Sequence, residues 1–214
     1  MANEMNPQIS AWTSEFGREY TERNNFTVQS MDSLYMDRYG STRTAMNHEF
    51  LDGIDRTIRI LEVGCNIGTQ LSFLGQMGFQ NLSGIDVQES AVELARAHLP
   101  SAELLVSPGQ ELPFPDDYFD LVFTSGVLIH IAPKELGTVM QEIHRCSRKL
   151  IWGFEYYSEN QAAIPYRGNE GLLWKNDFAR MYCEQFPDLS VVLKKNFPYV
   201  GEDIVDSMFL LQKP

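Results

Sequence analysis

Apolar and polar positions follow two different spacings along the chain, one near the start and another in the rest. Trp12, Phe16 and Tyr20 recur every four residues and Arg23 follows, which predicts that they share one face of a helix. Such a face either packs against the remainder of the protein or closes over a ligand. We therefore expect residues 1–50 to form an N-terminal helical lid region.

From about Ile58 onward, short apolar runs alternate with segments of helical spacing. The predicted strands are Arg59–Val63, Asn81–Val87, Glu103–Val106, Asp120–Thr124 and Lys149–Phe154. The predicted helices are Leu71–Met77, which begins near Gly68, Glu89–His98 and Pro133–Arg145. Strands that alternate with helices imply right-handed βαβ units and a parallel sheet.

The C-terminal part departs from this alternation. Ser190–Lys195 and Met208–Gln212 are strand-like runs with no helix between them, which predicts an antiparallel hairpin at a sheet edge. The fold class is therefore α/β: a mostly parallel seven-stranded sheet with helices on both faces and a C-terminal antiparallel hairpin. Residues 51–214 form this single domain. An aperiodic segment rich in Tyr and Asn, at about residues 155–174, is long enough to predict a functional lid insertion.

A glycine-rich turn joins the first predicted strand to the first helix. In Glu62-Val63-Gly64-Cys65-Asn66-Ile67-Gly68, Gly64 permits the tight turn and Gly68 a close approach. The free amides of the following helix N-terminus face the same place. This strand–turn–helix context indicates a nucleotide-like ligand.

An acidic residue ends the second predicted strand. Asp86, in Gly84-Ile85-Asp86-Val87, lies 22 positions after Gly64, near the spacing of an acid that binds a ribose hydroxyl pair. A helix cap is the alternative role for such an aspartate. Together with the glycine turn, ribose binding is the favoured interpretation.

Glu62 bears on the kind of cofactor. A carboxylate two residues before the first glycine would repel a diphosphate, whereas it suits an ammonium group and a sulfonium centre. A nicotinamide-dependent oxidoreductase is therefore the weaker alternative, and a non-catalytic cofactor-binding module is another.

These residues resemble the first motif of the class I S-adenosylmethionine-dependent methyltransferases, with Asn66 at the place of the middle glycine. Asn tolerates a left-handed backbone, so we expect the turn to form. The resemblance implies a Rossmann-like methyltransferase fold, S-adenosylmethionine as cofactor and S-adenosylhomocysteine as product. The cofactor-binding residues that we expect are Tyr20, Glu62, Gly64, Cys65, Asn66, Gly68, Asp86, Val87, Gln110, Glu111 and Ser125.

Two later segments continue the resemblance. Gln110 to Asp120 is similar to the family's stretch between the third and fourth strands, where an acidic side chain usually contacts adenine. Ser107, Pro108 and Gly109 stand at that place, so we expect backbone groups near Gly109–Glu111 to take over the contact. Thr124 to Ile131 resembles the fourth-strand motif, whose end lies beside the methyl group in this family.

A narrower resemblance links the chain to the methylases associated with pseudaminic acid biosynthesis clusters. It rests on Phe16-Gly17-x-x-Tyr20-x-x-Arg23-Asn24, Glu155-Tyr156-Tyr157, Ile164-Pro165-Tyr166-Arg167-Gly168, Asp203-Ile204 and Phe209-Leu210-Leu211. The family name describes gene context and fixes no substrate.

The acceptor side is predicted from chemistry near the expected methyl group. His130 is a candidate general base, with a packing or cap histidine as the alternative. The acceptor-binding candidates are Arg23, Tyr156, Tyr157, Tyr166 and Arg167. Arg167 has the planar fork that binds a carboxylate or phosphate, and a surface ion pair is its alternative. The resulting hypothesis is methyl transfer to O or N of a small molecule: a sugar, an acid or a modified peptide end.

Composition limits the partners. The formal net charge of −12 argues against a nucleic-acid backbone and an anionic membrane surface. Three scattered cysteines, Cys65, Cys146 and Cys183, show neither metal spacing nor a disulfide framework, so we expect no metal and a cytoplasmic location. The polar start MANEMNPQIS predicts no signal peptide. A monomer and a homodimer both remain open.

Overall fold

A computed structural model describes residues 6–214, and residues 1–5 of the predicted lid region lie outside the described part. Its strands are β1 (Arg59–Val63), β2 (Asn81–Asp86), β3 (Glu103–Val106), β4 (Phe119–Ser125), β5 (Ser147–Tyr156), β6 (Ala162–Ala163), β7 (Trp174–Lys175), β8 (Ser190–Pro198) and β9 (Val205–Gln212). The helices are α1 (Pro7–Trp12), α2 (Glu15–Arg23), α3 (Val28–Tyr39), α4 (Arg43–Leu51), α5 (Thr69–Gln76), α6 (Glu89–His98), the 3-10 turn η1 (Leu128–His130), α7 (Pro133–Cys146) and α8 (Phe178–Gln185).

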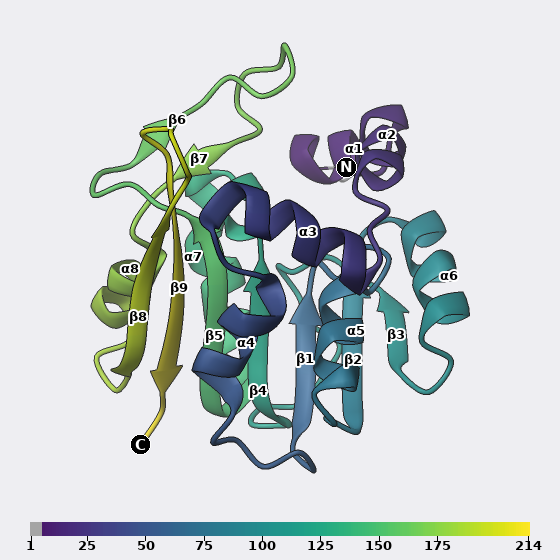
Figure 1. Cartoon of the computed structure of the whole chain (residues 1–214), viewed down its shortest axis with the longest axis vertical. Coiled ribbons are helices and arrows are strands. Elements are labelled where there is room, and N and C mark those ends of the chain that lie inside the picture. Colours follow the sequence, from purple (N-terminus) through teal and green to yellow (C-terminus); the bar gives the residue numbers. More distant parts are fainter. Residues whose placement is uncertain (1–5) are drawn as a thin grey trace, which may run out of the picture.

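Seven strands form one sheet in the order β3-β2-β1-β4-β5-β9-β8 (Figure 1). The first five strands are parallel, and β9 runs antiparallel between β5 and β8. All seven predicted strands are confirmed within two residues at most ends, and so is the C-terminal hairpin. Strand order reverses beside β1, where open α/β sheets bind ligands at the strands' carboxyl ends.

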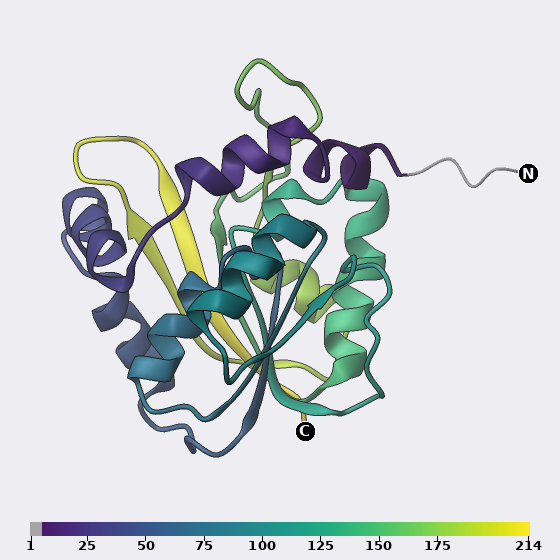
Figure 2. The ribbon, with the colours of Figure 1, turned by 90° about the vertical axis from the view of Figure 1, so that its right-hand side faces the viewer.

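The two faces of the sheet carry separate hydrophobic clusters. On one face α3, α4, α5 and α6 bury side chains such as Leu51, Leu71 and Val92 against the strands. On the other face α7 and α8 bury Ile143, Tyr182 and their neighbours. Since α3 and α4 contribute to the core, only α1 and α2 of the predicted lid region lie apart from the sheet (Figures 1 and 2).

Two features of the helices differ from the sequence prediction. The face that was expected on one helix is divided, because the chain turns at Thr13 and Ser14 between α1 and α2. Gly17 permits this turn, since a Cβ there would lie 1.8 Å from the Trp12 carbonyl oxygen. The sequence analysis also missed α8, although Asp177 caps it by accepting a hydrogen bond from the Arg180 amide.

Candidate functional site

A cavity of about 290 Å³ lies at the carboxyl ends of β1, β2, β4 and β5. Helices α1 and α2 cross above these strand ends, so they form part of its roof (Figure 2). One end of the cavity is lined by the turns that follow β1 and β2, and the other end by α3, β5 and β9. We refer to these two parts as the turn end and the strand-pair end.

The turn after β1 has the backbone that its glycine and asparagine allow. Gly64 has φ +77° and Asn66 has φ +46°, both in the left-handed region. The Gly64 and Cys65 amides donate to the Ile85 carbonyl at 2.8 Å each. A Cβ on Gly64 would lie 2.6 Å from Val127 Cγ2, so close packing against the chain after β4 excludes a side chain here.

Asp86 ends β2 at the cavity wall and organises the turn. Its Oδ2 accepts from the Asn66 amide and its Oδ1 from the Gln88 amide, each at 2.9 Å. Burial raises the pKa of Asp86 above its ordinary value, while these amides oppose the shift. Each carboxylate oxygen retains a lone pair after one amide bond, so the group has the capacity to accept from paired hydroxyls.

Glu62 is the second carboxyl group of the turn end and is only 2% exposed. Burial raises its pKa well above the ordinary value, and the nearby Arg43 opposes this. Its Oε2 has no hydrogen-bond partner among residues 6–214. Because a buried acceptor without a donor is costly, this oxygen fits a ligand that brings a cationic or N–H donor group. The residues present therefore fit S-adenosylmethionine, with Glu62 toward its ammonium group and Asp86 toward its ribose.

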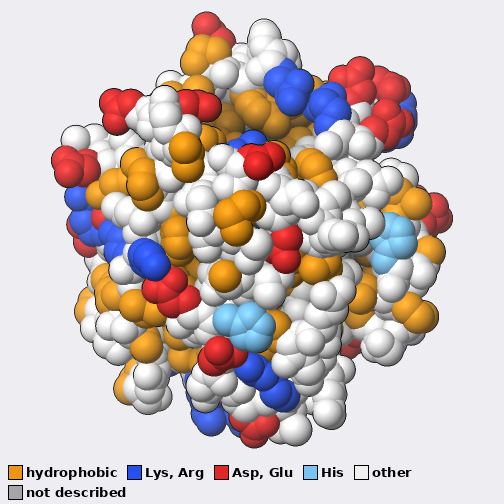
Figure 3. All heavy atoms as spheres, in the orientation of Figure 1, with side chains coloured by type: hydrophobic (Ala, Val, Ile, Leu, Met, Phe, Trp, Pro, Cys, Tyr) orange, Lys and Arg blue, Asp and Glu red, His pale blue; other side chains and the backbone are white. Residues whose placement is uncertain are grey.

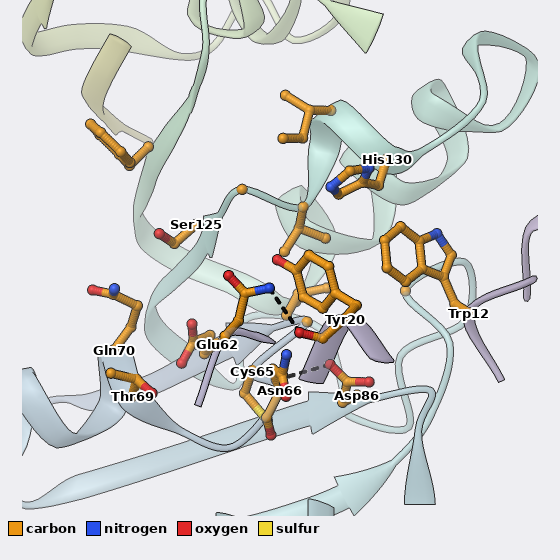
Figure 4. A pocket seen from close by; sticks show the side chains of 18 of the residues that line it. Trp12, Tyr20, Glu62, Cys65, Asn66, Thr69, Gln70, Asp86, Ser125 and His130 are labelled. Atoms are coloured by element: carbon orange, nitrogen blue, oxygen red, sulfur yellow. Dashed lines mark hydrogen bonds between the residues drawn. The ribbon is translucent and has the colours of Figure 1, made fainter. Parts of the chain in front are cut away.

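Aromatic rings, together with the imidazole of His130, line part of the cavity. Figure 4 shows Tyr20 between the Asn66–Asp86 turn and the imidazole of His130. The His130 ring centroid lies 4.7 Å from that of Trp12, 6.1 Å from Tyr20 and 5.2 Å from Tyr166. These contacts bring Trp12 and Tyr20 of the predicted stripe onto one wall of the cavity, whereas Phe16 and Arg23 do not line it.

The hydrogen bonding of His130 determines its tautomer. A carbonyl only accepts, so Nδ1 donates its proton to the Leu172 oxygen at 2.7 Å and Nε2 carries the lone pair. Burial lowers the pKa of His130 to about 4. The imidazole is therefore neutral near pH 7 and accepts through Nε2, although its low pKa makes it a weak base.

The roof is attached to the sheet by buried polar side chains. Gln8 donates to the His130 carbonyl at 2.8 Å and accepts from the Ala132 amide at 2.5 Å. Thr21 donates to the Asn66 side chain at 3.1 Å, and Gln88 donates to the Gly17 carbonyl at 2.9 Å. In this structure α1 and α2 are thus closed over the cavity.

Most of the predicted site residues line this cavity. They are Tyr20, Glu62, Gly64, Cys65, Asn66, Asp86, Val87, Gln110, Ser125, His130, Tyr156 and Tyr166. Cys65 is buried, which raises its thiol pKa well above the ordinary value, so it stays protonated near neutral pH.

The remaining predicted residues lie elsewhere. Gly68 faces α6, where a Cβ would lie 2.6 Å from Leu99 Cδ1, and Glu111 is exposed. Arg23 pairs with Glu19 on the surface of α2, and Lys194 lies over the ring of Tyr157. Arg167 is exposed at the tip of its loop, with φ +50°. None of these five is among the residues that line the cavity.

Sequence reasoning missed several cavity residues. Gln8, Arg38, Tyr39 and Asp206 all line it, although no motif marks them. Glu155 was noted only as part of a resemblance; it is 1% exposed and accepts from the Val127 and Ile129 amides, which holds η1 at the end of β4. The available signal in the sequence was a Glu directly after an apolar strand, since a charged side chain at such a position is buried only when it has hydrogen-bond partners.

Residues 61–150, which contain both turn motifs and β4, match the family model described as a methyltransferase domain. This part of the chain is therefore similar to a methyltransferase domain. The matched part ends in β5, so it leaves out α1–α4 and the β8–β9 hairpin.

Two sequence relatives agree with this family match. An uncharacterised methyltransferase of Synechocystis is 30% identical over 87 residues, 41% of this chain and 41% of its own length. The methyltransferase GfsG of Streptomyces halstedii is 23% identical over 166 residues, 69% of this chain and 59% of its own length. The chain thus spans about half the length of these relatives.

Solved structures share the fold over the whole chain. The magnesium protoporphyrin IX methyltransferase of Synechocystis PCC 6803, solved with bound S-adenosylmethionine, matches with a TM-score of 0.68 at 14% identity and covers 100% of both chains. The fold is the Rossmann-like methyltransferase fold, as predicted. Together with the domain match, this supports an enzyme of the methyltransferase type with S-adenosylmethionine as cofactor.

Within residues 6–214 no helix has the length and apolar character that crossing a membrane requires. The same residues contain no group of three or more His, Cys, Asp or Glu side chains placed to hold a metal ion.

Proposed function

We propose that the protein is an S-adenosylmethionine-dependent methyltransferase that acts on O or N of a small molecule. The observation that carries this proposal is one cavity lined by Asp86 and Glu62 at its turn end and also by His130 and Tyr20, with Glu62 Oε2 lacking a hydrogen-bond partner among residues 6–214. When bound, S-adenosylmethionine supplies an electrophilic methyl group. An acceptor lone pair forms the new bond to that carbon while the sulfur–carbon bond breaks, leaving S-adenosylhomocysteine.

The chain's own residues mainly position the reactants. Asp86 accepts from the ribose hydroxyls, and Glu62 accepts from the ammonium group through Oε2. The aromatic wall of Trp12, Tyr20 and Tyr166 excludes water from the reacting centre. His130 Nε2 accepts a hydrogen bond from the acceptor and takes up the proton that the acceptor releases as the new bond to carbon forms.

The domain organisation belongs to the same proposal. Residues 51–214 form the methyltransferase domain, and within residues 1–50 the lid is α1 with α2. Residues 155–174 are a second lid segment. In this segment the Tyr166 ring packs against His130, and the Leu172 carbonyl accepts the hydrogen bond from His130 Nδ1. The narrower relation to pseudaminic acid-associated methylases fits this organisation, because Tyr20, Tyr156 and Tyr166 from its motifs all line the cavity.

The surface is consistent with a small acceptor. Figure 3 shows acidic and basic side chains in small separate groups, with no continuous basic area on that face. We propose a small molecule, and neither nucleic acid nor membrane, as the acceptor. A cytoplasmic location is part of the proposal, since Cys65, Cys146 and Cys183 are free.

The test uses methyl-labelled S-adenosylmethionine and the small-molecule fraction of a cell extract. We expect a labelled product whose mass exceeds that of its acceptor by one methylene, formed by the wild type and lost in Asp86→Asn. Binding of S-adenosylhomocysteine without any labelled product would instead indicate the non-catalytic module.

A further inference from the structure

The strand-pair end of the cavity carries two opposite charges that do not pair with each other. Arg38 comes from α3 and Asp206 from β9, and both line the cavity. Arg38 is the one Lys or Arg among the cavity residues that the structure describes, whereas Glu62, Asp86 and Asp206 are acids. No carboxylate oxygen of residues 6–214 lies within 4.0 Å of an Arg38 side-chain nitrogen.

Asp206 is buried completely, at 0% exposure, and only half of its carboxyl group is satisfied. Its Oδ2 accepts from the Tyr39 hydroxyl at 2.5 Å and from the Tyr199 hydroxyl at 3.1 Å. Its Oδ1 has no hydrogen-bond partner in the described part of the chain. A buried carboxylate oxygen without a donor is costly, so it indicates a donor that a ligand supplies.

The position of this pair suits an acceptor. Asp206 lies opposite Tyr156 in the β5–β9 ladder, so both side chains project from the same face at the end of β5. Tyr156 lines the cavity together with Ser125 from the end of β4, where the methyl group is expected. The Arg38 guanidinium is held 5.0 Å above the Tyr199 ring, which limits its movement.

We propose that Arg38 and Asp206 form the acceptor-binding subsite, for a small carboxylic acid that also carries a hydroxyl or amino group. Arg38 binds the acceptor's carboxylate, and Asp206 accepts a hydrogen bond from the hydroxyl or amino group. An anionic acceptor needs a local cation because the net charge of −12 repels it elsewhere. This inference rests on the proposed methyltransferase function and narrows its acceptor.

The experiment measures binding of four probes by calorimetry at saturating S-adenosylhomocysteine. Two probes, 3-phenyllactate and phenylalanine, carry both groups, and their ring suits the aromatic wall. The third, 3-phenylpropionate, lacks the hydroxyl or amino group, and 3-phenylpropane-1,2-diol lacks the carboxylate. We expect the wild type to bind one of the first two at least about tenfold more tightly than either incomplete probe.

Variants then assign each preference to its residue. Arg38→Gln should remove the preference for the carboxylate, and Arg38→Lys should restore only part of it because an ammonium lacks the planar fork. Asp206→Asn, which keeps the side-chain shape, should remove the preference for the hydroxyl or amino group. Arg167→Gln removes the same charge from an exposed residue outside the cavity and is the matched control.

The possible results separate the two levels of the proposal. All variants should bind S-adenosylhomocysteine within about twofold of the wild type, since the turn end is intact. If the wild type itself does not bind S-adenosylhomocysteine, the proposed methyltransferase function is overturned. Normal cofactor binding with no probe preference, or a preference that follows Arg167 and not Arg38, would overturn the acceptor subsite alone. If Asp206→Asn fails to fold, Arg38→Gln at a half-buried site still decides.

Discussion

The two ends of the cavity are built in different ways. At the turn end, the wall comes from two strand–turn segments, and backbone amides hold the side chains, as with Asn66 and Gln88 on Asp86. At the strand-pair end, Arg38 and Tyr39 from α3 meet Asp206 from β9. Tyr39 and Asp206 form a hydrogen bond although they are more than 160 residues apart in the sequence. The first end is therefore encoded by local motifs, and the second by tertiary packing.

The largest loss of cofactor affinity is expected from a substitution at Gly64, where the backbone conformation itself forms the turn end. Gly64→Ala places a Cβ 2.6 Å from Val127 Cγ2 at φ +77°, which moves the turn away from the cofactor. We expect affinity for S-adenosylhomocysteine to fall by more than about 100-fold, because strain of roughly 1–3 kcal/mol adds to the steric overlap. Calorimetric titration of the wild type and of Gly64→Ala with S-adenosylhomocysteine measures this loss of affinity.

Gly201→Ala is the matched control for that substitution. Gly201 has the same φ of +77°, but a Cβ there has no atom within 4 Å. It should lose some stability while binding the cofactor normally. Equal losses of affinity in both variants would show that backbone strain, rather than the turn itself, explains the result.

His130 also lines the cavity, and its burial predicts a pH dependence. Its pKa is lowered to about 4 in the folded protein, whereas the unfolded chain keeps the ordinary value of 6.5. Between these values the unfolded state binds more protons, so this group lowers the free energy of unfolding as pH falls, by roughly 3 kcal/mol in total. His130→Gln removes this contribution.

Urea unfolding at about pH 7.5 and about pH 4.5 tests the assignment. The stability difference between wild type and His130→Gln should be largest at the higher pH and should shrink at the lower one. A difference of the same size at both pH values would mean that the imidazole titrates in the folded protein as it does in the unfolded chain.

At the turn end, Asp86 is the side chain with the most direct expected contact. Asp86→Asn replaces one accepting oxygen by a donor, so a charged hydrogen bond of about 1.5–3 kcal/mol is lost. Affinity for S-adenosylhomocysteine should fall roughly 10- to 150-fold. Glu111→Gln, which removes the same charge from an exposed residue outside the cavity, should change nothing.

The smallest effect concerns the roof that covers both ends. Gln8→Ala removes two hydrogen bonds, to His130 and Ala132, so α1 should open more often. We expect S-adenosylhomocysteine to dissociate several-fold faster, and hydrogen exchange in α1 and α2 to rise, for a loss of about 1 kcal/mol. Gln185→Ala removes a similar bond to the Gly137 carbonyl on the surface and should leave both measurements unchanged.

The same contrast explains what could be predicted from the sequence. The strands and the turn end follow from local rules: apolar periodicity, a glycine turn, and an acid at a strand end. Asn66 could be placed because few side chains accept a left-handed backbone. Arg38 and Asp206 could not, since nothing in either local sequence indicates that α3 lies beside β9.

The two arginines that the sequence suggests for the acceptor lie outside the cavity. Arg23 is a candidate because it shares the helical spacing of the aromatic residues, and Arg167 because its planar fork suits a carboxylate, but neither side chain lines the cavity. Arg167 is exposed, and its guanidinium lies 5.9 Å from the centroid of the Tyr166 ring, so it lies beside a cavity residue without lining the cavity itself. The break between α1 and α2 was missed because spacing alone does not report the close contact at Gly17.

The central claim is that the turn end binds S-adenosylmethionine, and one calorimetric titration tests it most directly. The wild-type protein is titrated in parallel with S-adenosylhomocysteine and with NAD. Glu62 Oε2, which has no hydrogen-bond partner among residues 6–214, favours the ammonium group of the first ligand and opposes the diphosphate of the second. We expect micromolar binding of S-adenosylhomocysteine and no measurable heat with NAD. Absence of S-adenosylhomocysteine binding, or tighter binding of NAD, would contradict the account.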